Sequence, residues 1–186
     1  MDKSKIWEIK SKKEILKLKI FKIQELNCYL PSKKMDHNFY KIKLHDWVNI
    51  FALTSDNKII LVNQHRLGNN MVTTEVPAGA INKNEDPLES AKRELTEETG
   101  YTTENIFLLK KISVNPAIQD NYCYFFLALD CKKTSETNFD PSEELEVVLE
   151  NIKKINDITQ SDFMDNSLSF LSVMLAKEHL LRAGKI

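Results

Sequence analysis

Apolar and polar residues alternate in the N-terminal part of the chain. Between residues 16 and 20, leucine and isoleucine alternate with lysine, a period of two that is typical of a strand with one buried face. Residues 23–30 continue this strand or form another, residues 31–34 form a turn, and residues 40–44 alternate again. So few strands cannot bury a core of their own. We therefore expect residues 1–45 to be a β-rich segment that packs on the main domain or on another subunit.

Longer apolar runs follow in the middle of the chain. Residues 48–53 and 59–62 are apolar and are separated by turn residues at 55–58, which predicts a hairpin with both strands largely buried. Residues 63–66 continue the second strand with polar side chains, and residues 73–76 form a short strand. Because the hairpin strands are apolar on both faces, we expect them to lie inside the main domain.

A helix is predicted between Asp86 and Gly100. Asp86 is a suitable N-cap, Pro87 suits the first helical position, and Gly100 suits a left-handed C-terminal cap. Three positions with helical spacing form one apolar stripe: Leu88, Ala91 and Leu95. This helix should therefore pack one face against the core.

Strands and helices also follow the central helix. Strands are expected at 106–114, 122–129 and 145–149, and a short helix at 151–158. Asp165 can cap a final helix with apolar positions at Leu168, Leu171, Leu175 and Leu181. Strands on both sides of a central helix, with another helix at the end, predict a mixed-sheet α/β sandwich over residues 46–186.

Composition and charge narrow the class of protein. The chain has 186 residues and a net charge of −1, from 26 basic and 27 acidic residues, which argues against a nucleic-acid-binding surface. Its three cysteines, Cys28, Cys123 and Cys131, lack metal-ligand spacing. No stretch resembles a signal peptide or a membrane span. We expect a protein of the cytoplasm with reduced thiols and no membrane partner.

The other face of the central helix carries three acids. Glu94, Glu97 and Glu98 stand at positions i, i+3 and i+4, where like charges destabilise a helix by roughly 0.2–0.5 kcal/mol per pair. They also lie near the helix C-terminus, where the helix dipole disfavours anions. Such acids are usually a solvated face, but converging carboxylates also suit Mg²⁺ or Mn²⁺. Arg93 can pair with one acid and fix its rotamer, and Glu85 is a further carboxylate upstream.

The full spacing around these acids favours a function for them. Gly79 is followed after five residues by Glu85, and after seven more by Arg-Glu-Leu-Thr-Glu-Glu-Thr-Gly, which ends at Gly100. This pattern resembles the Nudix box of the Nudix hydrolases. The one departure is Tyr101, where the pattern more often has an aliphatic residue. The resemblance implies a Nudix fold, an α/β/α sandwich around a mixed sheet.

The resemblance also implies a reaction. Nudix hydrolases cleave a nucleoside diphosphate linked to another group, with the help of divalent ions, here Mg²⁺ or Mn²⁺. By match to the box, Glu94 and Glu98 are metal ligands, and Glu97 is a ligand or supports one. The carbonyl of Ala78 is a further ligand, for which the conformational freedom of Gly79 is useful. The catalytic group so implied is Glu97, Glu98 and Arg93, with Glu85 orienting the loop or its metal.

Features outside the box resemble the members that cleave ADP-ribose. Gln64-His65-Arg66 is similar to their Gln-Tyr-Arg segment, and Glu75 to Gly79 and Pro116 also fit that subgroup. Arg66 would hold the diphosphate through two hydrogen bonds. Glu75 would contact the substrate or a metal-bound water, or else form a structural salt bridge. Trp47 would stack on the base, unless it is a core residue.

Three further expectations come from the same resemblance. The general base would be a glutamate before the last strand, either Glu143 or Glu144, or else a residue of the box. The N-terminal β-segment would build a homodimer. The substrate would be ADP-ribose or a related nucleoside diphosphate sugar. The alternatives are clean-up of nucleoside triphosphates or dinucleotides, and a sensor that binds nucleotide sugars without cleaving them.

Overall fold

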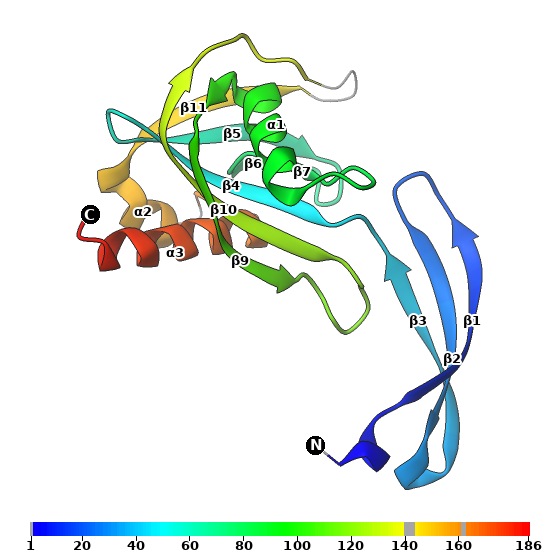
Figure 1. Cartoon of the computed structure of the whole chain (residues 1–186). Helices are drawn as coiled ribbons and strands as arrows, with labels where there is room; N and C mark the ends of the chain where they lie inside the picture. Colours follow the sequence, from blue (N-terminus) through cyan, green and yellow to red (C-terminus); the bar gives the residue numbers. More distant parts are fainter. Residues whose placement is uncertain (1, 140–143, 161–162) are drawn as a thin grey trace. The chain divides into compact units, whose positions relative to one another are not determined.

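The chain folds into two compact units (Figure 1). The computed structural model describes residues 2–139, 144–160 and 163–186. The first unit contains the residues up to Asp46 together with Ser113–Tyr122, and the second contains Trp47–Ile112 and Cys123–Ile186.

Three antiparallel strands make up most of the first unit. They are β1 (Glu8–Lys17), β2 (Lys22–Leu30) and β3 (Met35–Lys43), in the order β1-β2-β3. Short 3₁₀ turns precede β1 (η1, Lys3–Lys5) and link β2 to β3 (η2, Pro31–Lys33). The segment Ser113–Tyr122 joins β3, because the Ile42 amide donates to the Ile118 carbonyl (2.7 Å) and Lys41 pairs with Asp120 (2.9 Å). Of the two possibilities left open for residues 23–30, the structure shows a separate strand, β2.

One expectation for the N-terminal segment was wrong. The alternation at residues 16–20 was expected to be one half-buried strand, but β1 ends at Lys17 and is exposed throughout. The chain then reverses, and the Leu18 amide donates to the Phe21 carbonyl (2.9 Å). This reversal contains no glycine, proline or asparagine, so the usual turn signals are absent.

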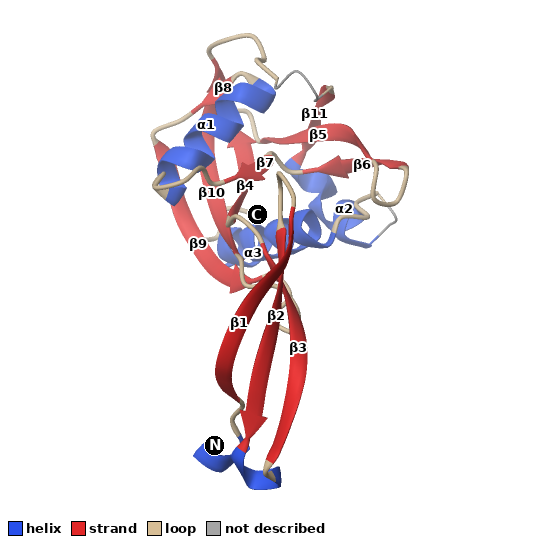
Figure 2. Ribbon diagram, turned by 90° about the vertical axis from the view of Figure 1, so that its right-hand side faces the viewer, coloured by secondary structure: helices blue, strands red, loops and turns tan. Residues whose placement is uncertain are grey.

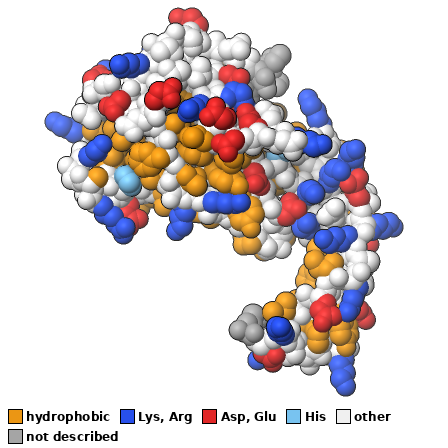
Figure 3. All heavy atoms as spheres, viewed as in Figure 1, with side chains coloured by type: hydrophobic (Ala, Val, Ile, Leu, Met, Phe, Trp, Pro, Cys, Tyr) orange, Lys and Arg blue, Asp and Glu red, His pale blue; other side chains and the backbone are white. Residues whose placement is uncertain are grey.

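Figure 3 shows lysine side chains gathered over one end of the three-stranded sheet and apolar side chains over the other.

The second unit is built around an eight-stranded mixed sheet. Its central path has the order β11-β5-β4-β10-β8, with β6 paired to β5, β7 to β4 and β9 to β10. The pair β4–β10 is parallel and the pair β4–β5 is antiparallel, as the predicted hairpin requires. The bounds are β4 (Trp47–Thr54), β5 (Lys58–Arg66), β6 (Met71–Glu75), β7 (Ala78–Ala80), β8 (Tyr101–Thr102), β9 (Asn105–Ser113), β10 (Tyr122–Lys133) and β11 (Leu145–Asn151).

Helices cover both faces of this sheet (Figures 1 and 2). Phe51 and Leu53 of β4 belong to a core that includes residues of α2 (Ile155–Gln160) and α3 (Ser167–Arg182). Ile50 and Ala52, which alternate with them, belong to a second core against α1 (Pro87–Thr99). Since alternate side chains of a strand point to opposite faces, a strand buried between two helical layers has apolar residues on both faces. The mixed-sheet α/β/α sandwich is therefore confirmed.

The central helix begins and ends where the sequence predicts. Asp86 accepts a hydrogen bond from the Leu88 amide (2.9 Å), and Pro87 is the first helical residue. Gly100 closes the helix with φ +74°, and a Cβ there would overlap the Ser135 carbonyl. The predicted apolar stripe is buried on the sheet, with Leu88 at its edge. The helix therefore has a defined start, end and rotation.

The helical region after β11 differs from the prediction in three details. Its N-cap is Asn166 rather than Asp165, and a 3₁₀ turn (η3, Ile152–Lys154) with α2 replaces the single short helix. The fully buried face is formed by Ser169, Ser172, Val173, Ala176 and Leu180. Three of the leucines predicted to form the apolar stripe lie beside that face, and Leu181 is 53% exposed. Because α3 packs directly on β4, small side chains fit beneath it.

The described helices and the three cysteines bear on the class of protein. Among the residues that the structure describes, no helix is long and apolar enough to cross a membrane. The three cysteines are free thiols, and all are buried.

Candidate active site

The helix α1 presents three acids at graded depth. Glu98 is 5% exposed, and its Oε2 accepts a hydrogen bond from the Ala78 amide of β7 (2.9 Å). The Glu94 side chain is 13% exposed and that of Glu97 is 39% exposed. The acids predicted from the box therefore lie along one face of α1, from a buried carboxylate beside the sheet to one near solvent.

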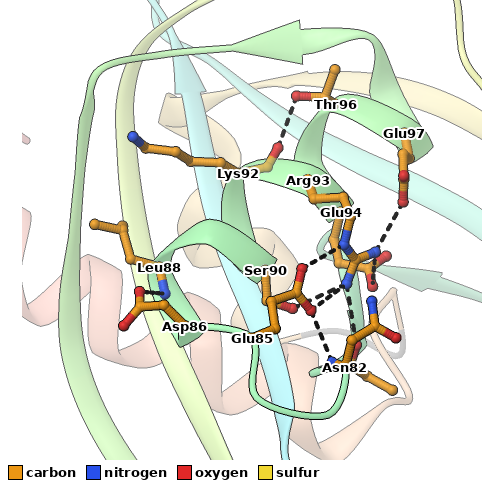
Figure 4. A network of polar contacts seen from close by, with 11 residues as sticks. Asn82, Glu85, Asp86, Leu88, Ser90, Lys92, Arg93, Glu94, Thr96 and Glu97 are labelled. Atoms are coloured by element: carbon orange, nitrogen blue, oxygen red, sulfur yellow. Dashed lines mark hydrogen bonds and ion pairs between the residues drawn. The ribbon is translucent and has the colours of Figure 1, made fainter.

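Arg93 binds the acids around it (Figure 4). Its Nη1 donates to Glu94 Oε1 (2.8 Å) and Glu97 Oε2 (3.0 Å). Its Nε and Nη2 donate to the two oxygens of Glu85 (2.8 and 3.0 Å). The hydrogen bonds with Glu85 raise the pKa of Arg93, and they lower the pKa of Glu85 to about 2. Arg93 thus offsets the like-charge repulsion that the sequence predicts for this face.

Glu85 connects the loop before α1 to this cluster. Besides pairing with Arg93, its Oε2 accepts a hydrogen bond from the Asn82 amide (2.8 Å). Arg93 also donates to the Ala80 carbonyl (3.3 Å) and the Ser90 hydroxyl (3.2 Å). The loop from β7 to α1 is therefore tied to the helix through one guanidinium, an arrangement that fits the expected role of Glu85.

Gly79 is needed for space rather than for an unusual backbone conformation. Among the described glycines only Gly100 and Gly184 have a positive φ. Gly79 lies in β7 opposite Val48, and a Cβ at this position would overlap the carboxylate of Glu94. The expectation that Gly79 supplies backbone freedom was therefore wrong in its reason. A side chain here would push Glu94 out of its place.

A cavity of about 370 Å³ brings the acids together. It is lined by Glu94, Glu97 and Glu98 with Arg93, and also by Asn138 and Phe139, which the sequence did not suggest. The Asn138 amide donates to the Glu97 carbonyl (2.8 Å), so the chain after β10 is joined to the end of α1. No pattern around these two residues signals this contact, because it depends on where a loop crosses a helix end.

The donor chemistry of this cavity fits a divalent cation, although the side chains are not arranged as a metal cage. Carboxylate oxygens are the ligands that Mg²⁺ and Mn²⁺ prefer. Within the described parts of the chain, no three His, Cys, Asp or Glu side chains stand close enough together to hold an ion. Arg93 lies between Glu94 and Glu97 and draws both towards itself. The acids share one cavity, and rotation of their side chains is the change that metal binding requires.

A second cavity, of about 380 Å³, shares Gly79 and Ala80 with the first as lining residues. Trp47, Arg66 and Glu75 also line it, as does Asn166. The short strand β7 therefore separates an acidic cavity from one that contains an aromatic ring and a guanidinium. Asn166 could have been noticed in the sequence only as an alternative helix cap.

Arg66 and Glu75 form an ion pair inside the second cavity. Nε and Nη2 of Arg66 donate to the two oxygens of Glu75 (2.8 and 2.7 Å), and the Glu75 side chain is 2% exposed. Burial raises the pKa of Glu75, but hydrogen bonds from Arg66 and Thr73 outweigh it, and the pKa lies below its ordinary value. Glu75 is therefore ionised at neutral pH, and it takes one edge of the guanidinium.

Among the described residues, neither cavity is lined by Gln64, Pro116 or Glu144. The Gln64 carbonyl lies 3.4 Å from the Thr73 hydroxyl. Pro116 belongs to the first unit. Glu144 is exposed and immediately precedes β11, whereas Glu143 lies outside the described residues. Their proposed roles stay predictions.

Comparison with known proteins identifies the family. Residues 43–168 match the family model of the NUDIX domain, which is more than half of the chain. The chain belongs to the NUDIX family. The Nudix fold and the class of enzyme predicted from the box, a Nudix pyrophosphohydrolase, are thereby confirmed.

Two relatives and one solved structure are similar over different lengths. The chain is 34% identical over 102 residues to a methanol dehydrogenase activator of Bacillus methanolicus, covering 54% of this Nudix chain but only 55% of that protein. It is 28% identical over 179 residues to an ADP-ribose pyrophosphatase of Bacillus subtilis (strain 168), covering 94% and 95% of the two chains. A crystal structure of an ADP compounds hydrolase matches with a TM-score of 0.85 over 97% of each chain. Because the two sequences are only 20% identical, this match supports the fold alone.

The ion pair between Arg93 and Glu85 predicts a pH-dependent stability. Because the pKa of Glu85 is lowered from 4.5 to about 2, its contribution is present above the ordinary pKa and is lost as the pH falls towards 2. Glu85→Gln should lower the free energy of unfolding by about 1 kcal/mol at neutral pH. In urea titrations, the difference from the wild type should shrink between about pH 5 and about pH 3.

Glu89→Gln is the matched control, since Glu89 lies on the same helix and meets Lys92 at 3.6 Å with an exposed side chain. We expect it to change stability by less than Glu85→Gln at every pH. A destabilisation by Glu85→Gln that stays constant down to about pH 3 would contradict the assigned ion pair.

Proposed function

We propose that this Nudix hydrolase cleaves the pyrophosphate bond of ADP-ribose or a related nucleoside diphosphate sugar, giving a nucleoside monophosphate and a sugar phosphate. The observation that carries the proposal is the pair of cavities that share β7. One gathers the acids of the box and the other contains Trp47 and Arg66. The similarity to an ADP-ribose pyrophosphatase over 94% of the chain supports the same substrate class.

Nudix hydrolases generally use divalent cations. We assign Glu94, Glu97 and Glu98, with the carbonyl of Ala78, to hold Mg²⁺ or Mn²⁺. When bound, such an ion neutralises phosphate charge and acidifies water. Glu98 is kept in place by the Ala78 amide, and Arg93 holds Glu94 and Glu97 until they turn towards a cation. Binding of a cation therefore requires Glu94 and Glu97 to exchange their hydrogen bonds with Arg93 for bonds to the ion.

The residues of the second cavity are assigned to the nucleotide. Trp47 stacks on the base, and its place in the lining supports this. Arg66, whose Nε and Nη2 donate to Glu75, is assigned to the diphosphate because its guanidinium suits phosphate oxygens. Gln64 and Pro116 are assigned to the substrate only by their resemblance to the ADP-ribose subgroup.

The general base is assigned to the segment before β11. Glu144 is exposed there, and Glu143 precedes it in the chain. A carboxylate on this segment would take a proton from the attacking water. Arg93 contributes by keeping the acids of α1 in one cavity.

We also propose a homodimer and a cytoplasmic location. The first unit is a single layer of three strands with exposed apolar side chains, among them Ile9, Ile15 and Phe39, and a single layer needs a partner to bury them. The three free cysteines support a reducing compartment. A net charge of −1 agrees with a small-molecule substrate rather than a nucleic acid.

Activity measurements test the reaction and the role of the helix. The full chain with Mg²⁺ should hydrolyse ADP-ribose or another nucleotide sugar faster than nucleoside triphosphates or dinucleotides, and EDTA should abolish the reaction.

Glu98→Gln should lower kcat roughly 100-fold or more with an unchanged fold, the scale expected when one charge-stabilising group is removed. The exposed Glu89→Gln on the same helix is the control and should retain activity. Full activity in EDTA, or near-normal activity of Glu98→Gln, would contradict the proposal.

Sedimentation measurements test the dimer. Ile9 and Ile15 are exposed on β1, so replacing both with lysine leaves the cores of the second unit untouched. We expect the wild type to have the mass of two chains and the double variant that of one. A wild-type monomer, or an unchanged mass for the variant, would reject a dimer built through this strand.

A further inference from the structure

The buried carboxylate of Glu75 is surrounded by hydrogen-bond donors. Its Oε1 accepts from Arg66 Nε (2.8 Å) and from the Thr73 hydroxyl. Its Oε2 accepts from Arg66 Nη2 (2.7 Å), and the side chain of Asn166, which lines the same cavity, also favours the ionised form of this carboxylate by lowering its pKa. A carboxylate has about four lone-pair sites. Arg66 and Thr73 together occupy three of them, so little of the acceptor capacity of Glu75 remains for a substrate.

Asn166 lines the same cavity as Glu75 and Arg66. Its Oδ1 accepts from the Leu168 and Ser169 amides (3.0 Å each) and so caps α3. Since that oxygen is engaged, only the amide nitrogen is left to donate to Glu75. Nearby, the Val76 amide donates to the Ser169 hydroxyl (3.2 Å). The start of α3 is thus fastened through Ser169 to the residue that follows β6.

Thr73 approaches the same carboxylate along β6. It lies two residues before Glu75, so both side chains point to one face of the strand, and both are buried. The intervening Thr74 points to the opposite face, where its hydroxyl bonds Asn63 Oδ1 (2.8 Å). The strand therefore has two adjacent threonines whose hydroxyls both form hydrogen bonds, and only the hydroxyl of Thr73 contacts Glu75.

We propose that Thr73 and Asn166 are positioning residues for substrate binding, which act through Glu75 to hold the Arg66 guanidinium in one orientation within the second cavity. Glu75 is the link in this chain of contacts and does not itself touch the substrate. An arginine held before binding loses less freedom when an anionic ligand arrives, so preorganisation tightens binding. The role in substrate binding rests on the proposed function, whereas the immobilisation of Arg66 does not.

Arginine side-chain NMR tests the immobilisation without any substrate. The chain contains three arginines, Arg66, Arg93 and Arg182, so their Nε–H signals can be assigned by single substitutions. Thr73→Val and Asn166→Ser should speed hydrogen exchange of the Arg66 Nε–H by about five- to tenfold, the scale of one lost hydrogen bond. The Arg93 signal should not change. Serine is as good an N-cap as asparagine, so Asn166→Ser keeps the cap of α3 and removes only the amide donor.

Thr74→Val is the matched control, because it removes a hydroxyl from the same strand without touching Glu75. It should leave exchange of the Arg66 Nε–H unchanged. If Thr73→Val and Asn166→Ser also leave it unchanged, the positioning proposal is overturned, whatever the enzyme hydrolyses.

Kinetics with ADP-ribose and Mg²⁺ test the consequence for binding. Thr73→Val should raise KM about five- to tenfold with little change in kcat, and should have no further effect in an Arg66→Ala background, because it acts only through that arginine. Equal effects in both backgrounds would overturn the proposal. A wild type that hydrolyses no nucleotide sugar would refute the proposed function instead, and the exchange measurement would still decide whether Arg66 is held.

Discussion

The guanidinium of Arg93 is the centre on which the acidic cavity depends. Three carboxylates on adjacent turns near a helix C-terminus repel one another and oppose the helix dipole. Arg93 compensates by donating to Glu94 and Glu97 of the helix and to Glu85 of the loop that precedes it. An acidic cluster that a helix alone would disfavour is thereby compatible with a stable fold.

The strand β7 lies between this acidic cavity and the second cavity. Its amide at Ala78 binds Glu98, and the absence of a side chain at Gly79 leaves room for Glu94. The same residues form part of the wall of the cavity that holds Trp47 and Arg66. A substrate with a diphosphate between a nucleoside and a sugar has its reactive bond between two chemically different ends. The two cavities that share β7 are the basis on which such a substrate is proposed.

Local rules predicted much of the fold, and contacts between distant segments account for the rest. The caps at Asp86 and Gly100 were found from the sequence because each depends on a few neighbouring residues. The buried face of α3 was not, since it is set by how closely the helix packs on β4 and not by where leucines occur. The pairing of Arg66 with Glu75 joins two strands whose register the pattern does not specify. The acids of the box were located from spacing alone, whereas the partners at Asn138 and Asn166 depend on tertiary packing.

The central claim is that the acids of α1 form a divalent metal site, and direct binding of Mn²⁺ is its most immediate test. Titration of the full chain with Mn²⁺, followed by the loss of the free-ion EPR signal, should reveal binding by the wild type. Glu98→Gln should weaken that binding by roughly tenfold or more, and the exposed Glu89→Gln should leave it unchanged. A wild type that binds no Mn²⁺, or a Glu98→Gln variant that binds it as tightly, would contradict the account.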